Sequence, residues 1–124
     1  MDLMLLGPHG ILVIESKCYA NDTKCEGDKW FVKVGDRGYW KPTKSVSSQL
    51  RGSIQRVKRA LGSELKKSKV PVTGVIVFNN RATLDVATCP EPLIRQREVL
   101  DFVRRLPGAN VNLVGIEKAI DRIG

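Results

Sequence analysis

Residues 1–17 constrain the fold of this chain more than any other segment. Leu3 to Leu6 and Ile11 to Ile14 are two short apolar runs of the kind that forms strands, and residues 7–10 (GPHG) between them are a turn signal. A two-residue turn at Pro8 and His9 predicts an antiparallel hairpin. The chain is therefore expected to build a sheet that begins with this hairpin.

Charged side chains lie at the open end of the hairpin. Side chains alternate between the two faces of a strand, so Glu15 and Lys17 share a face with Ile11 and Val13. The same register places Asp2 directly opposite Glu15. Like charges opposed on adjacent strands destabilise a sheet. A divalent metal ion held between the two carboxylates would remove that repulsion.

Composition indicates one domain, residues 1–124, in a reducing compartment. The chain is 42% hydrophobic, enough for one core, and no apolar run approaches the roughly 20 residues that cross a bilayer. Nothing at the N-terminus resembles a signal peptide. The three cysteines are an odd number, which argues against a disulfide framework and favours the cytoplasm. A net charge of +8 favours a polyanionic partner such as nucleic acid and gives no reason to expect a membrane partner.

Much of the positive charge lies in the segment that also predicts the longest helix. The segment from Lys44 to Lys69 contains eight basic residues and one acidic residue, Glu64. Thr43 or Ser45 can cap the helix, which starts just after Pro42. Apolar residues recur at three- and four-residue spacing and predict one buried stripe: Val46, Leu50, Ile54, Val57, Leu61 and Leu65.

Polar residues border that apolar stripe on both sides. At about 100° per residue, Gln49, Ser53 and Arg56 form a polar stripe along one border. Arg51 and Lys58 lie along the other. The helix is thus expected to be a basic rod with one buried side, and for any single lysine a solvated surface position is the simplest interpretation.

The rest of the chain predicts an α/β or α+β domain with one mixed sheet. The segment from Tyr19 to Asp28 is polar and predicts a loop. Val72 to Phe78 predicts a strand buried on both faces. Further strands are expected over residues 29–34, 39–40 and 83–87, and further helices over residues 92–106 and 113–123.

These features together resemble a known nuclease superfamily. An aspartate, a hairpin and then E-x-K on the next strand are similar to the PD-(D/E)xK nucleases, and more narrowly to the nuclease-related domain, NERD. The resemblance covers about residues 2–106, with residues 107–124 as a C-terminal helix. It implies a restriction-endonuclease-like mixed sheet with an antiparallel hairpin, flanked by helices. The matching features are Asp2, residues 7–10, Ile14 to Lys17, Trp30, Pro42 to Gln49, and Val72 to Phe78.

The resemblance implies a metal-dependent DNA nuclease that uses Mg²⁺ or Mn²⁺. Asp2, Glu15 and the backbone carbonyl of Ser16 would hold the metal ion, which prefers oxygen ligands. Lys17 would orient or deprotonate the attacking water, or stabilise charge on the phosphorane. Gln49 resembles the family's glutamine, which would position water or a phosphate oxygen.

Basic residues of the long helix would grip the DNA backbone without reading bases. Members of the family usually begin with a helix and a strand before the aspartate, whereas Asp2 directly follows Met1. The chain is thus expected to be a fragment or truncated member, or to replace that element with its C-terminal helices or a partner subunit, for example in a homodimer. The expected nucleic-acid contacts are Lys44, Arg51, Arg56, Lys58 and Arg59.

Other interpretations stay open for the same residues. A catalytically silent module that binds nucleic acid or protein would keep the fold and the basic helix. Glu15 and Lys17 could be an exposed pair of little energetic value. Trp30 and Trp40 are expected in the core or on a sheet face rather than as base-stacking residues, and His9 in solvent.

A zinc site is a further alternative. It would combine Cys18 and Cys25 with His9 or Cys89, but the six-residue gap between the first two cysteines fits no common zinc knuckle. Cys18 is expected to point away from Glu15 and Lys17.

Overall fold

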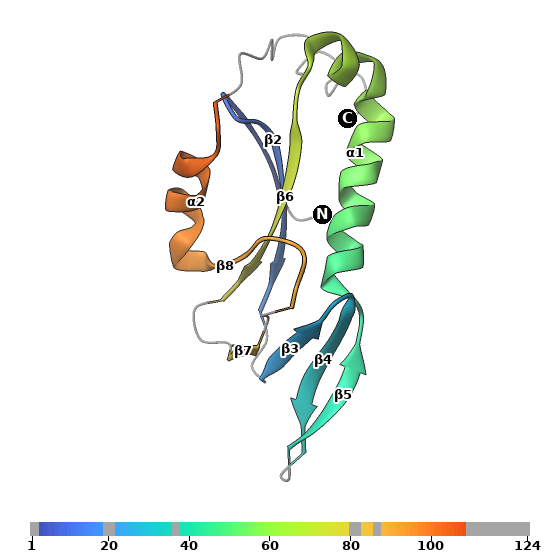
Figure 1. The fold of residues 1–124 in the computed structure, drawn as a ribbon, viewed down its shortest axis with the longest axis vertical. Coiled ribbons are helices and arrows are strands. Elements are labelled where there is room, and N and C mark those ends of the chain that lie inside the picture. The colour runs from blue at the N-terminus through green and yellow to red at the C-terminus, as the bar shows by residue number, and fades with distance from the viewer. Residues whose placement is uncertain (1–2, 19–21, 36–37, 80–82, 86–87, 109–124) are drawn as a thin grey trace.

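The computed structural model describes residues 3–18, 22–35, 38–79, 83–85 and 88–108. They form an α+β domain with two mixed sheets (Figure 1). In chain order the elements are β1 (Leu3–Gly7), β2 (Gly10–Lys17), β3 (Thr23–Glu26), β4 (Lys29–Val34), β5 (Tyr39–Thr43), α1 (Val46–Ser68), β6 (Val72–Phe78), β7 (Leu84–Asp85), β8 (Leu93–Arg95), the 3₁₀ turn η1 (Gln96–Glu98) and α2 (Val99–Arg105).

The first sheet has the strand order β1-β2-β6-β8 and contains the predicted hairpin. Leu3 pairs with Ile14 and Gly7 with Gly10, which confirms the two-residue turn and its register. Gly10 has a φ of +94°, and a Cβ there would lie 2.5 Å from the carbonyl oxygen of Pro71. Glycine is therefore required where the hairpin meets the start of β6.

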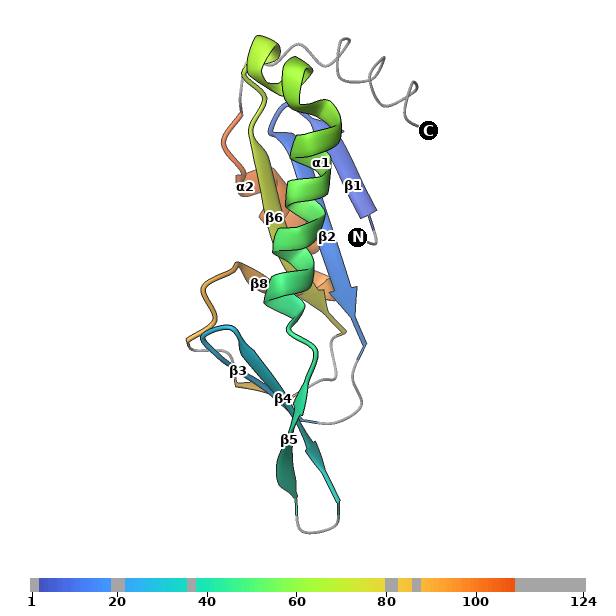
Figure 2. The same ribbon diagram turned by 90° about the vertical axis from the view of Figure 1, so that its right-hand side faces the viewer.

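Strand β6 is buried on both faces, as its β-branched sequence predicts. It lies parallel to both β2 and β8. Ile76 and Phe78 join the core under α1, whereas Val75 and Val77 join a second core that packs against α2 residues such as Phe102. Figure 2 shows α1 and α2 on opposite sides of this sheet. The first sheet is thus covered on both faces, as is typical of parallel strands.

Helix α1 confirms the predicted amphipathic pattern. Val46, Leu50, Val57 and Leu61 are buried. Of the two proposed caps, Ser45 is the one used, because its side chain accepts a hydrogen bond from the Ser48 backbone N–H.

The close approach of α1 to the sheet depends on Gly74. A Cβ at this position would lie 2.6 Å from Ile54 Cδ1 and 2.9 Å from Leu50 Cδ1. A side chain on β6 at this point would therefore push α1 outward, and the apolar stripe of the helix would lose contact with the strand.

The second sheet, with order β5-β4-β3-β7, corrects the prediction of a single mixed sheet. Its strand β3 lies within the segment that was expected to be a loop. Thr23 and Cys25 are buried there, and β3 pairs with β4 antiparallel, Cys25 opposite Trp30. On its other edge β3 pairs with β7, and Thr88 donates to the Cys25 carbonyl from 63 residues away in sequence, so local polarity is misleading.

The helix predicted over residues 92–106 is also partly wrong. Leu93–Arg95 instead adds β8 to the edge of β6, and only Val99–Arg105 is α-helical. The strand expected over residues 83–87 is found as β7, at Leu84–Asp85. The helix expected over residues 113–123 lies outside the described residues.

One finding bears on membrane association. Among the described residues, no helix is both long enough and apolar enough to cross a lipid bilayer.

Candidate active site

The candidate site is built around a buried carboxylate on β2. Glu15 is 4% exposed and lies on the face of β2 that α1 covers. Ser53 of α1, itself fully buried, donates a hydrogen bond from Oγ to Glu15 Oε1 over 2.9 Å. A carboxylate is costly to bury unless it is hydrogen-bonded, so this contact fixes Glu15 against the helix. The alternative of an exposed Glu15–Lys17 pair is therefore wrong for Glu15.

A second hydrogen bond links this contact to the surface. Arg56 donates from Nη2 to Ser53 Oγ over 3.0 Å. A hydroxyl can donate and accept at the same time, so Ser53 joins an exposed guanidinium to a buried carboxylate. The predicted polar stripe of Gln49, Ser53 and Arg56 thus faces the carboxylate. Sequence reasoning identified the stripe but assigned Ser53 no role.

Gln49 lies one helical turn before Ser53. Helix α1 and strand β2 run in opposite directions (Figure 1), so Gln49 lies toward the end of β2 that carries Lys17. A four-residue step along a helix, about 6 Å, matches a two-residue step along a strand. The Oε1 atom of Gln49 is buried, and no described residue donates a hydrogen bond to it. Such an acceptor calls for a donor or a cation.

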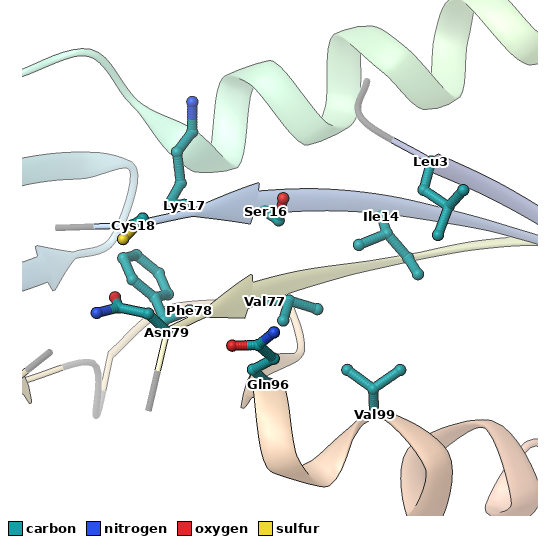
Figure 3. A pocket seen from close by; sticks show the side chains of 10 residues that line it. All are labelled: Leu3, Ile14, Ser16, Lys17, Cys18, Val77, Phe78, Asn79, Gln96 and Val99. Atoms are coloured by element: carbon teal, nitrogen blue, oxygen red, sulfur yellow. The ribbon is translucent and has the colours of Figure 1, made fainter. Parts of the chain in front are cut away.

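Lys17 ends β2 and is half-buried. Figure 3 shows its side chain directed to the α1 side, whereas Cys18 points the other way, as predicted. A pocket of about 540 Å³ opens at the carboxyl ends of β2 and β6, lined by Lys17, Asn79 and Gln96 among others. Glu15 does not line this pocket, so the pocket does not define the site.

The backbone of Ser16 is directed toward the β1 edge. Ile11 N–H donates to Pro71 and Lys17 C=O accepts from Asn79, so odd-numbered residues of β2 direct their backbone groups to β6. The backbone N–H and C=O groups of successive residues point to alternate edges of a strand. The Ser16 carbonyl therefore points to the β1 edge of β2. The hairpin register predicts Asp2 on that side, but Asp2 lies outside the described residues.

The oxygen donors suit a hard divalent cation. Mg²⁺ commonly takes one or two carboxylates and completes its shell with water and substrate oxygens. Glu15 is a buried carboxylate that could bind such an ion, and the Gln49 amide oxygen is a second buried acceptor on the α1 stripe. Among the described residues there is no cluster of three or more His, Cys, Asp or Glu side chains that could hold a metal ion. Asp2 remains the second carboxylate ligand that the sequence predicts.

Comparison with known families adds an independent finding. The family model of the nuclease-related domain matches residues 1–79, more than half of the chain. This chain belongs to the NERD family. The match spans the hairpin, helix α1 and strand β6, so it includes the carboxylate site and agrees with a PD-(D/E)xK relationship. Searches of curated proteins and of solved structures found no match to the chain.

Most basic residues proposed to contact DNA are exposed in this NERD domain. Lys44, Arg56, Lys58 and Arg59 all lie at the surface of α1 or just before it. Arg51 is different, because its Nη1 contacts Asp28 Oδ1 at 3.0 Å and also contacts Glu91. The hydrogen bond to Asp28 raises the pKa of the Arg51 guanidinium. Arg51 therefore ties α1 to the second sheet, and DNA binding by it stays a prediction.

The cysteines of the NERD domain do not assemble a zinc site in the described residues. Burial, with a contribution from Cys89, raises the pKa of the Cys25 thiol to about 12. Its Sγ donates to the carbonyl oxygen of Gly27 at 3.0 Å. Burial therefore favours the protonated form of the Cys25 thiol.

The structure also tests the predicted positions of Trp30, Trp40 and His9. Trp30 is a core residue, as expected, stacked on Phe78 and donating from Nε1 to Ser47 Oγ. Trp40 is on a sheet face, also as expected, and is 36% exposed. The prediction that His9 is solvated is wrong: its ring packs over Gly7, and its Nε2 is buried.

Proposed function

We propose that this NERD domain is a metal-dependent DNA nuclease that hydrolyses phosphodiester bonds with Mg²⁺ or Mn²⁺. The supporting observation is the buried Glu15 carboxylate, fixed by Ser53 and followed two residues later by Lys17 on the same face of β2. Burying a carboxylate in this way costs stability.

Each residue has a distinct role in the proposal. Asp2, Glu15 and the Ser16 carbonyl hold the cation. When bound, the cation polarises the scissile phosphate and lowers the pKa of a coordinated water. Lys17 orients or deprotonates the attacking water, or stabilises charge developing on the phosphate.

Gln49 and the basic surface position the substrate. The buried Oε1 of Gln49 accepts a hydrogen bond from the attacking water, which fills its unmet bonding capacity. Lys44, Arg56, Lys58 and Arg59 contact phosphates. Such contacts position a strand and carry no base specificity. Arg56 has a second role, since its guanidinium reaches Glu15 through Ser53.

A second function is favoured by a different observation. The described residues hold one carboxylate at the site and no cluster of acidic side chains. A domain that binds nucleic acid through the basic helix and does not cut would show the same feature. Its binding would fall steeply with salt and would not respond to metal ions.

One cleavage experiment tests the nuclease directly. Plasmid and single-stranded DNA are incubated with the parent protein in Mg²⁺, Mn²⁺ or EDTA, beside Glu15→Gln and the control Glu64→Gln. Glu15→Gln preserves the side-chain shape, and its amide oxygen can still accept from Ser53. We expect metal-dependent cleavage, lost by about a thousandfold in Glu15→Gln and unchanged in Glu64→Gln.

The same experiment separates the two functions. Equal cleavage by Glu15→Gln and the parent would rule out this site. A folded parent that binds DNA but does not cut it in either metal would establish the silent binding module instead.

A further inference from the structure

The second sheet has one buried and one open face. Strand pairing places Cys25 opposite Trp30 and Trp30 opposite Thr43, and this face packs on the core beneath α1. Neighbouring residues along each strand point the other way. They form what we call the open face, made of Lys24, Glu26, Lys29, Phe31, Lys33, Trp40 and Pro42.

The open face interleaves aromatic rings with ammonium groups. Lys24 Nζ lies 4.7 Å from the centre of the Trp40 ring and 5.2 Å from that of Phe31. Lys33 Nζ lies 5.9 Å from the Trp40 ring. The Trp40 side chain is large, apolar and 36% exposed, and no described element covers this face. The ammonium groups of Lys24 and Lys33 therefore each lie close to an aromatic ring of the same face.

A groove continues the open face along β4 and β5. It has a volume of about 430 Å³, and its lining residues are Asp28, Lys29, Trp30, Phe31, Pro42 and Thr43. Lys29 pairs with Glu26 across the sheet, and Lys24 contacts Glu26 at 3.2 Å. The open face therefore offers flat apolar surface with three lysines around it.

We propose that the open face binds single-stranded DNA, with a base stacked on Trp40 and lysines on the flanking phosphates. Every base has a flat π-face, so stacking on an exposed ring suits a strand of any sequence. A duplex keeps its bases stacked inside and cannot offer them to Trp40. An ammonium over an exposed ring is held weakly, so a base can replace Lys24 there and leave its charge to a phosphate.

Two features of the chain favour this occupant over a protein partner. The net charge is +8, and the open face carries three lysines, Lys24, Lys29 and Lys33, against one acid, Glu26. The second sheet also lies beyond the carboxyl ends of β2 and β6 (Figure 1), on the side where Lys17 ends its strand. The inference takes DNA as the substrate from the proposed function and adds that the strand is single.

Intrinsic fluorescence tests the proposal without cleavage. The chain has two tryptophans, of which Trp30 is buried and Trp40 exposed, so quenching by a ligand reports mainly on Trp40. Quenching is measured on the parent in EDTA, and the affinities of the parent, Trp40→Ala, Trp40→Phe and Tyr39→Ala are measured from the fluorescence anisotropy of an end-labelled oligothymidylate and of a labelled duplex of the same length. Tyr39 is the matched control, because it neighbours Trp40, is 64% exposed and lies on the other face.

The expected result is specific to stacking. The oligothymidylate quenches the parent, and Trp40→Ala weakens its binding about tenfold, with the salt dependence unchanged because no charge is lost. Tyr39→Ala binds like the parent, and Trp40→Phe restores most of the affinity. Duplex binding is the same in all four proteins.

Two results would overturn the proposal. One is equal oligothymidylate affinity in Trp40→Ala and Tyr39→Ala, with no quenching of the parent. The other is protection of Trp40 from acrylamide that rises with protein concentration alone, which would assign the face to a second copy of the chain. Because EDTA prevents cleavage, a failed nuclease assay leaves this test intact, and a failed binding test leaves the nuclease proposal intact.

Discussion

The two sheets of this NERD domain differ in how completely they are covered. The first is enclosed by α1 on one face and α2 on the other, and it carries the buried Glu15. The second is covered on one face and leaves Trp40 and its lysines open. Chemistry on a phosphate benefits from fixed, desolvated groups, whereas capture of a flexible strand requires exposed ones. Under the two proposals, this difference in burial would separate cleavage from strand capture within one small domain.

The two sheets nevertheless share one core. Trp30 of the second sheet stacks on Phe78 of the first, with ring centres 5.7 Å apart, and donates to Ser47 of α1. Arg51 adds ionic contacts to Asp28 and Glu91. The proposed strand-binding face of the second sheet is therefore held at a fixed place relative to the proposed chemistry on the first.

The largest effect is expected from Lys17→Ala, which tests whether the proposed cleavage chemistry belongs to the first sheet. If the chemistry belongs to the first sheet, kcat for DNA cleavage should fall about a hundredfold, because the group that activates water or stabilises charge is lost. Affinity for DNA in EDTA should change little. Lys67→Ala, in the last turn of α1, removes the same charge far from Glu15 and is the control. Equal kcat in the two variants would remove Lys17 from the site.

A smaller effect is expected from Ser53→Ala, which tests whether burial against α1 prepares the carboxylate. Loss of the 2.9 Å hydrogen bond to Glu15 should weaken Mn²⁺ binding about tenfold, since partners that orient a metal ligand contribute on this scale. Calorimetric titration with Mn²⁺ measures it without DNA. Ser53→Thr keeps the hydroxyl and should recover much of the affinity.

The control for that experiment is Ser63→Ala, at an exposed position of the same helix. If Ser53→Ala and Ser63→Ala bind Mn²⁺ as tightly as the parent, Ser53 only fills the interface and does not position Glu15.

The smallest effect concerns the junction of the sheets. Arg51→Met keeps most of the side-chain packing but removes the contacts to Asp28 and Glu91. Because Arg51 is 44% exposed and solvent screens its ion pairs, the free energy of unfolding should fall by only about 0.5–1 kcal/mol. Urea denaturation of Arg51→Met beside Lys58→Met measures the difference. A single shared transition is expected, and two separate transitions would show that the sheets unfold independently.

Local patterns predicted several parts of this fold well. The apolar runs and the GPHG turn gave the hairpin and its register, because a two-residue turn permits one pairing. The spacing of Val46, Leu50 and Val57 predicted the buried side of α1, because residues spaced by three or four share one face of a helix. Both signals lie within a few residues of one another in the sequence.

Other parts depend on partners far away in the sequence. Strand β3 is polar in sequence, but it pairs with β7, and Cys25 joins a core that includes Leu50 and Phe78. Residues 93–95 become β8 because the edge of β6 is available to them, which shortens the predicted helix. Propensity yields to tertiary pairing at both places.

The candidate site also combines local patterns with contacts between distant parts of the sequence. Strand and helix periods are local properties, so they place Glu15 and Lys17 on one face and Gln49, Ser53 and Arg56 on one stripe before any fold is known. The contact between these two sets depends on tertiary packing, which brings Ser53 within 2.9 Å of Glu15 although 38 residues separate them in sequence. The pairing of Arg51 with acids and the exposure of Trp40 depend on tertiary packing in the same way. Packing of α1 across the sheet fixes these contacts, and no local pattern encodes which helix face meets which strand.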